Sequence, residues 1–182
     1  MIAPVAVLIA AVMSSVAAGP TLVARAGCTP SYLNNKPTNI EGINYPFGGP
    51  GEWRPDSLTV NSAVKGVFEA RTSPGEWRIV PSIQDASKYN IRSTGASTLA
   101  LSVASGGGAK LATFNDADAT QRFTIECETC GSTTSQPHSF TCTFRTSSNE
   151  CITSVVGGAL SAMACQTGFS YDQSFDFLQF GV

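Results

Sequence analysis

The chain has few charged residues and a single histidine. Only 13% of its 182 residues are Asp, Glu, Lys or Arg, and the formal net charge at pH 7 is -2. This weakly negative net charge does not indicate a basic surface for nucleic acid or an anionic membrane. The sequence also lacks Gly-x-Ser-x-Gly and His-Glu-x-x-His motifs. We therefore expect a protein that is not an enzyme and needs no cofactor.

Long hydrophobic runs are missing except at the N-terminus. Residues 1–18 have the features of a secretory signal peptide, because the apolar core Val5–Val12 is too short to span a bilayer and small residues follow it. A second small-x-small site at Ala24–Ala26 would extend the removed part to residue 26 as a propeptide. A membrane anchor or buried helix is the alternative. We expect residues 27–182 to be secreted, extracellular and not inserted in a membrane.

Short strand-like segments fill the rest of the chain, and their outline repeats at about fifty residues. Leu111–Phe123 superposes on Met163–Phe175 without a gap, and both segments close on Gln-x-Phe. A more divergent first unit closes at Trp77, with strands predicted at 56–60, 67–70 and 76–80. Cys28–Pro50 is rich in Pro, Asn and Gly, which predicts an irregular N-terminal arm lying over the core.

Many short strands with Gly, Pro, Ser and Thr turns predict an all-β barrel or sandwich. Threefold repetition favours the β-trefoil, a six-stranded barrel capped by three hairpins with pseudo-threefold symmetry. We therefore predict a single β-trefoil domain over 27–182 with almost no helix. Trp77, Phe123 and Phe175 occupy the same position in three units and are predicted core. An immunoglobulin-like sandwich is the alternative, but it does not explain units that close on Gln-x-Phe.

All six cysteines lie in the expected mature part. An even number in a secreted chain predicts three disulfides. Cys151 and Cys165 lie within one repeat on adjacent predicted strands, so they should pair. A hairpin bond and a bond to the N-terminal arm complete the predicted set: Cys151–Cys165, Cys130–Cys142 and Cys28–Cys127. The rival arrangement exchanges Cys127 with Cys130.

The Cys127-Glu-Thr-Cys130 motif also suggests redox or zinc chemistry. A redox CxxC belongs at a helix N-terminus, whereas here a Gly/Ser/Thr loop follows. Zinc ligation by these two cysteines with His138 and Cys142 would match no common finger spacing. Thiols in an oxidising compartment pair with each other, so we expect no metal site and an exposed loop position for His138.

At the repeat closures, Gln121-Arg-Phe123 and Gln173-Ser-Phe175 resemble the Gln-x-Trp signature of ricin-B-type β-trefoil lectins. The spacing of Cys151, Gly157-Gly158 and Cys165 is similar to the disulfide pattern within a repeat of that family. The resemblance covers about residues 50–180 and is clear in two of three units. It implies a secreted, lectin-like carbohydrate-binding module.

In that family an Asp, an aromatic ring and an Asn hold the sugar. One unit of this chain has Ser102, Leu111 and Thr120 at those positions, and the next has Thr153, Met163 and Asp172. Neither unit keeps the carboxylate, the ring or the amide, so we expect the usual galactoside site to be absent. Gln121 and Gln173 are then expected to hydrogen-bond the backbone rather than a ligand.

Any remaining ligand site should use loops, and 115–118 and 168–172 have the best polar and aromatic mix. The candidate ligand-binding residues are Trp53, Asn115, Asp116, Tyr171 and Asp172. Trp53 is a stacking platform if exposed and a lid on the barrel if buried. Asp116 with Asp118 could serve a glycosidase, but acidic residues in turns are usually solvated.

Two non-catalytic functions remain after these exclusions. The first is a carbohydrate-binding module whose partner is a glycan or glycoprotein. The alternative is a protein-binding trefoil, such as a protease inhibitor or a secreted effector, which the missing sugar-contact residues favour.

Overall fold

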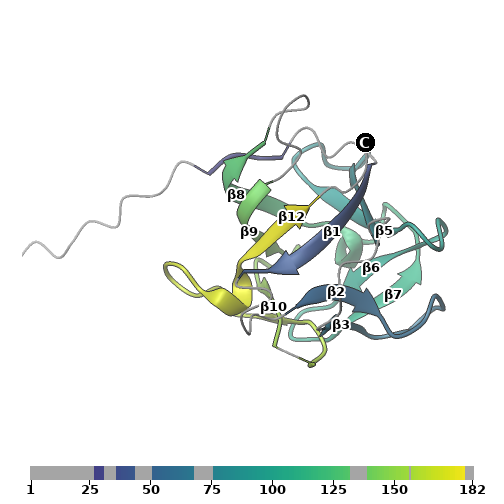
Figure 1. Ribbon diagram of the computed structural model, residues 1–182. Coiled ribbons are helices and arrows are strands. Elements are labelled where there is room, and N and C mark those ends of the chain that lie inside the picture. The colour runs from purple at the N-terminus through teal and green to yellow at the C-terminus, as the bar shows by residue number, and fades with distance from the viewer. Residues whose placement is uncertain are drawn as a thin grey trace, which may run out of the picture.

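In the computed structural model, antiparallel strands wrap around a closed core (Figure 1). The structure describes residues 27–30, 36–43, 51–67, 76–131, 139–155 and 157–178. The predicted signal peptide (1–18), the propeptide to residue 26 and His138 lie outside these residues. Within those ranges, no helix combines the length and apolarity of a membrane span.

The described residues form twelve strands and two short 3-10 turns. The strands are β1 (Pro37–Gly42), β2 (Glu52–Pro55), β3 (Val64–Val67), β4 (Trp77–Pro81), β5 (Tyr89–Ser93), β6 (Leu99–Val103), β7 (Ala109–Thr113), β8 (Thr124–Cys130), β9 (Ser139–Arg145), β10 (Cys151–Thr153), β11 (Ser161–Met163) and β12 (Phe175–Leu178). The turns are η1 (Ala119–Gln121) and η2 (Tyr171–Gln173).

The strands fall into three successive units, β1–β4, β5–β8 and β9–β12. The first and last strands of each unit build a barrel: β1 pairs with β12 and β4, β4 with β5, and β9 with β8 and β12. Between β5 and β8, Tyr89 and Phe123 exchange backbone hydrogen bonds of 2.8 and 2.9 Å, which closes the ring. In Figure 1, β12 lies between β1 and β9.

The middle two strands of each unit form a hairpin: β2–β3, β6–β7 and β10–β11. Isolated bridges join the hairpins to one another, at Ala63–Lys110, Lys65–Ala159 and Gly108–Ser161. A closed barrel capped by three mutually bridged hairpins is a β-trefoil. The fold predicted from the sequence is therefore confirmed.

The core lies inside the barrel, as the repeated aromatic positions predict. Trp77, Phe123 and Phe175 are all fully buried. Trp53 on β2 joins them, since its ring lies 4.8 Å from Phe144 and 4.7 Å from Phe175, measured between ring centroids. Burial of such large side chains supplies most of the driving force for this fold.

Two predicted features of the first unit are wrong. Part of the predicted irregular arm is β1, a strand paired on both sides and almost wholly buried. Residues 56–60, predicted as a strand, form the β2–β3 turn instead. Ser62 Oγ accepts from the Ser57 N–H at 2.8 Å, and Leu58 is 46% exposed. Short polar side chains that bond nearby backbone favour turns over strands, despite the alternating pattern.

The Cys151–Cys165 disulfide is confirmed, whereas the predicted Cys130–Cys142 and Cys28–Cys127 pairs are wrong. The structure has the rival pairs, Cys127–Cys142 and Cys28–Cys130. The β8–β9 register explains the exchange, because it sets Cys127 directly opposite Cys142 and Cys130 opposite Ser139. Cys28 pairs its backbone with Cys127, but its sulfur joins Cys130.

Candidate functional site

The two closing glutamines serve the fold, as predicted. Gln121 Oε1 accepts from the Asn115 N–H at 2.9 Å, and its Nε2 donates to the Thr113 carbonyl at 2.9 Å. Gln173 repeats the pattern with the Gln166 N–H at 2.9 Å and the Ala164 carbonyl at 3.0 Å. Each amide thereby closes the two ends of the loop that precedes it.

The positions that hold sugar in the resembled family are occupied by internal contacts. Ser102 Oγ and Thr120 Oγ1 lie 2.8 Å apart and hydrogen-bond each other. In the third unit, Thr153 Oγ1 accepts from Gln173 Nε2 at 2.9 Å. These hydroxyls are already paired, while Met163 is 53% exposed on β11 and offers no ring.

The predicted loop residues Asn115 and Asp116 make structural hydrogen bonds, Asp116 to a neighbouring turn and Asn115 within its own loop. Asp116 Oδ2 accepts from the Ile83 and Gln84 N–H groups at 2.7 and 3.0 Å. Burial alone would raise the pKa of Asp116, but hydrogen bonds from Ser82, Gln84 and Ile83 outweigh it and hold the pKa below its usual value. Asn115 Oδ1 accepts from the Ala117 N–H within its own loop.

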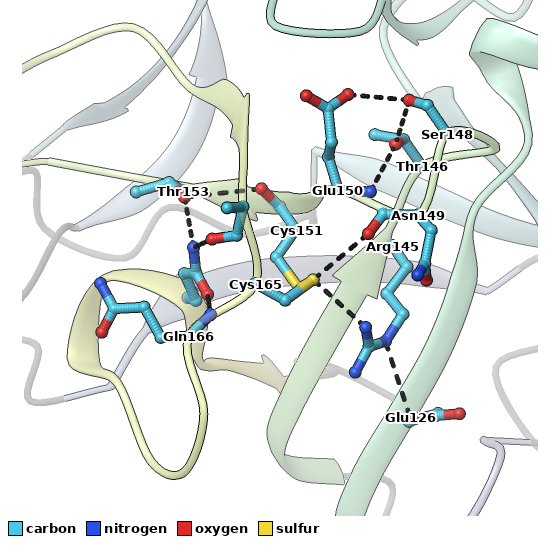
Figure 2. Close-up of a disulfide and its surroundings, with 12 residues drawn as sticks. Glu126, Arg145, Thr146, Ser148, Asn149, Glu150, Cys151, Thr153, Cys165 and Gln166 are labelled. Atoms are coloured by element: carbon cyan, nitrogen blue, oxygen red, sulfur yellow. Dashed lines mark hydrogen bonds and ion pairs between the residues drawn. A yellow bond between two sulfur atoms is a disulfide. The ribbon is translucent and has the colours of Figure 1, made fainter.

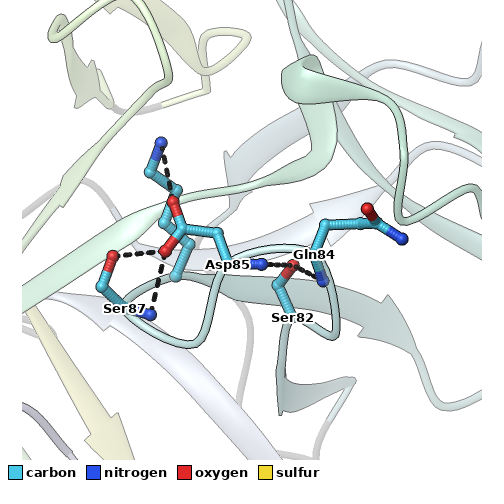
Figure 3. Close-up of polar contacts among 5 residues, drawn as sticks. Ser82, Gln84, Asp85 and Ser87 are labelled. Carbon is cyan, nitrogen blue, oxygen red and sulfur yellow. Dashed lines mark hydrogen bonds and ion pairs between the residues drawn. The ribbon is translucent and has the colours of Figure 1, made fainter.

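The turn that Asp116 supports, between β4 and β5, is itself closely bonded (Figure 3). Ser82 Oγ accepts from the Gln84 and Asp85 N–H groups, both at 3.2 Å. Asp85 in turn accepts from Ser87 and pairs with Lys88 at 3.4 Å. This network gives Asp116 a structural role and leaves Ile83 at the tip of the turn, 91% exposed.

Trp53 is not a surface platform, because its side chain is fully buried. Of the two alternatives drawn from the sequence, burial in the barrel is the one observed. Its ring therefore contributes to packing and cannot stack on a ligand at the surface.

Tyr171 and Asp172 lie in the third unit, beside a cavity of about 510 Å³. The loop that carries them projects from the barrel next to β10 (Figure 1). Side chains from β8, from β9 and from the segment that contains this loop line the cavity. The ones with polar or aromatic groups are Glu126, Glu128, Thr141, Thr143, Arg145, Gln166, Phe169, Ser170, Gln173 and Ser174. Two consecutive strands and a later loop thus contribute to one hollow.

The alternation of side chains along β8 and β9 explains which strand residues line the cavity. Ile125, Cys127, Cys142 and Phe144 face the core, so the residues between them on β8 and β9 face outward. Relative to β12, β9 also carries an extra residue at Thr141, where φ is 56° and the N–H donates to Asp176 Oδ1 at 2.9 Å. Such a bulge re-aims side chains, and here it lies in the cavity wall.

The loop side carries two exposed aromatic rings. Phe169 and Tyr171 are 49% and 53% exposed, and their centroids lie 4.7 Å apart in an edge-to-face arrangement. Each ring restrains the other, so the pair is organised although it faces solvent. Phe169 lines the cavity. The Asp172 carbonyl accepts from the Ser154 N–H at 2.8 Å, which anchors the loop to β10.

A cation and a carboxylate, Arg145 and Glu126, also line the cavity. Arg145 Nη1 donates to Cys165 Sγ at 3.2 Å, and its Nε lies 3.9 Å from Glu126 Oε2 (Figure 2). Both side chains are partly exposed. The guanidinium therefore keeps N–H groups directed at solvent, and the carboxylate keeps an oxygen there.

Phe169, Arg145 and Glu126 were not predicted as site residues. Phe169 lies inside the loop that the sequence singled out. Arg145 and Glu126 carried no signal beyond strand alternation, because only the β8–β9 pairing and the returning loop bring them together. Among the described residues, no group of three or more His, Cys, Asp or Glu side chains could hold a metal ion.

Comparisons with known proteins agree with the topology. No family model matches the chain, and no curated protein sequence matches it. Solved structures do match. A mosquitocidal holotoxin is 18% identical with a TM-score of 0.61, and Cry35Ab1 is 14% identical with a TM-score of 0.58. Each match covers 81% of this chain but only 18% and 36%, respectively, of the other chain.

The designed threefold symmetric protein ThreeFoil matches over almost its whole length. The match covers 79% of this chain and 98% of ThreeFoil, with 10% identity and a TM-score of 0.54. The fold is a β-trefoil. At these identities the likeness extends to the fold alone.

Proposed function

We propose that the protein is a secreted, non-catalytic carbohydrate-binding protein, related in function to the ricin-B-type lectins that its repeats resemble. Its binding site is the cavity lined by β8, β9 and the 166–172 loop rather than the usual galactoside position. Three disulfides support secretion, because such bonds persist in oxidising compartments outside the cytosol.

One observation carries the proposal: Phe169, one ring of an exposed aromatic pair, lines the same cavity as the polar side chains of Glu126 and Arg145. Phe169 can pack on the apolar face of a sugar ring while these polar side chains meet its hydroxyls. Glu126 accepts hydrogen bonds from hydroxyl groups, and Arg145 donates to them. The volume of about 510 Å³ lies within the range of roughly 300–1,000 Å³ usual for small-ligand sites.

The charge of the cavity favours a neutral ligand. Two carboxylates, Glu126 and Glu128, oppose one guanidinium, and Arg145 already has Glu126 beside it. A strongly anionic sugar would have to compete with these carboxylates. We therefore expect neutral oligosaccharides, recognised through one pyranose ring and its hydroxyls.

A glycan array probed with the protein tests this proposal. We expect signals for neutral oligosaccharides that Phe169→Ala removes and that Met163→Ala keeps, since Met163 is equally exposed in the same unit but does not line the cavity. An array that stays silent, or a signal that Phe169→Ala leaves unchanged, would contradict it.

A protein-binding role is the second candidate, and the β4–β5 turn favours it. Ile83 is 91% exposed at the tip of a turn whose backbone is held by Asp116 and Ser82. A rigid turn that presents one apolar side chain loses little entropy on docking into a pocket of another protein. A panel of secreted proteases, assayed with wild type and with Ile83→Asp, separates this role from sugar binding.

A further inference from the structure

The three disulfides differ in their surroundings. Cys127 and Cys142 belong to the hydrophobic core, and Cys28 and Cys130 pack against it. The Cys151–Cys165 bond lines the cavity, to which Cys127 also contributes, and Cys165 is partly buried, as Cys28 and Cys130 are. It is also the bond whose sulfur accepts a hydrogen bond from a guanidinium, that of Arg145 (Figure 2).

The fold itself supplies an internal comparison for this bond. The second unit has no cysteine between Leu99 and Phe123, yet Gln121 closes its loop with the same amide pattern that Gln173 uses in the third unit. A trefoil unit of this chain can therefore close without a disulfide. What the third unit gains from Cys151–Cys165 is an extra tie at the start of the loop that carries Phe169.

We propose that Cys151–Cys165 is a thiol-exchange site: a small external thiol reduces it while the other two disulfides stay oxidised, and its reduction frees the 166–172 loop. Its effect on sugar affinity rests on the proposed function; the exchange and the release of the loop do not.

The reaction follows ordinary thiol–disulfide exchange. A thiolate of the external reagent attacks Cys165 Sγ, the more accessible sulfur, and forms a mixed disulfide while Cys151 leaves as a thiolate. A second thiolate then attacks the reagent's sulfur, releasing Cys165 as a thiolate and the reagent as its own disulfide. The two protons of the reagent thiols end on Cys151 and Cys165, so two thiols are oxidised as one disulfide is reduced.

Arg145 has a defined part in this reaction. Its guanidinium lies 3.2 Å from Cys165 Sγ, where positive charge attracts the incoming thiolate and stabilises the Cys165 thiolate that the second step releases. After reduction, the hydrogen bonds from Gln173 and from the Ser154 N–H remain among the described residues to hold the two ends of the loop. These bonds exchange far faster than a covalent link, so the aromatic pair loses its fixed position.

Graded reduction of the full chain with reduced glutathione, followed by alkylation and peptide mapping, tests the order of reaction. We expect Cys151 and Cys165 to be alkylated about tenfold faster than the other cysteines, and Arg145→Gln to slow their reaction several-fold. Circular dichroism should stay that of the oxidised fold. Prior or simultaneous alkylation of Cys28 or Cys127, or loss of the fold with the first bond, would overturn the proposal.

Limited chymotrypsin digestion reads out the loop without any ligand. Cleavage after Phe169 or Tyr171 should accelerate once the bond is reduced, and a Cys151→Ser/Cys165→Ser variant should show the fast rate without reductant. An unchanged cleavage rate in both would show that the bond does not restrain the loop. Sugar titration of the same samples is scored separately: absence of binding in every state would refute the proposed function and leave the exchange site standing.

Discussion

Replacing Gln173 with leucine would test how the third unit is closed. The amide makes three hydrogen bonds, to the Gln166 N–H, the Ala164 carbonyl and Thr153 Oγ1, at 2.9 to 3.0 Å. Gln173 is only 5% exposed, so water cannot replace all three partners. At about 0.5–1.5 kcal/mol for each bond lost, Gln173→Leu should destabilise the protein by about 2–4 kcal/mol.

Urea unfolding of the oxidised protein, followed by tryptophan fluorescence, measures this loss. The midpoint should fall by about 1–2 M with an unchanged slope, given an m-value near 2 kcal/mol/M. Gln166→Ala is the matched control, because Gln166 is exposed and contributes only its backbone N–H to the closure. A loss below about 0.5 kcal/mol for Gln173→Leu, or equal losses for both variants, would refute the reasoning.

Three further predictions concern the core and its charges. Trp53→Ala should cost about 3–5 kcal/mol in urea unfolding, whereas Leu58→Ala, on the exposed turn, should stay within about 0.5 kcal/mol; equal costs would contradict the burial of Trp53. Burial raises the pKa of the Glu52 carboxyl above 4.5 despite its ion pair with Arg54. The stability that Glu52 contributes is therefore lost as pH rises through its pKa in the folded state. Unfolding free energies measured at about pH 5 and 8 should show this decline, and Glu52→Gln should make the decline smaller. Asp116, whose pKa is depressed, contributes stability that is lost as pH falls below 3.8, so acid unfolding of Asp116→Ala should begin from a lower stability and show a shallower acid dependence than wild type.

The repeat closures could be predicted because their signal is local. Gln121 and Gln173 each bond backbone within nine residues, and the aromatic two positions later always faces inward. A pattern set by such local contacts can be recognised in the sequence without knowledge of how distant segments pair. The barrel and its core aromatics therefore followed from the repeats.

The first strand could not be predicted, because its burial comes from its neighbours. Ile40 is the only large apolar residue of β1, and polar residues surround it. Asn39 is nevertheless fully buried, and its Oδ1 accepts from the Glu76 N–H at 3.3 Å. Polar side chains that find partners on adjacent strands can be buried, but only the paired sheet reveals those partners.

The cavity escaped prediction for a related reason. Arg145 and Glu126 are ordinary outward-facing strand residues until β8 pairs with β9 and the loop returns beside them. The exchange of Cys127 and Cys130 in the disulfides has the same origin, since the β8–β9 register decides which cysteine faces Cys142. The pairing register of two strands is hard to predict from the sequence when both faces of the strands carry polar and apolar residues together.

Titration calorimetry of the strongest neutral glycan from the array, against wild type, Phe169→Ala and Met163→Ala, tests the central claim most directly. Loss of the stacking ring should weaken binding by about 1–2 kcal/mol, a rise in Kd of roughly five- to thirtyfold, without changing the unfolding midpoint. Met163→Ala should bind as wild type does. If Met163→Ala loses affinity while Phe169→Ala keeps it, the ligand sits at the family's usual position and the cavity lined by Phe169 is not the site.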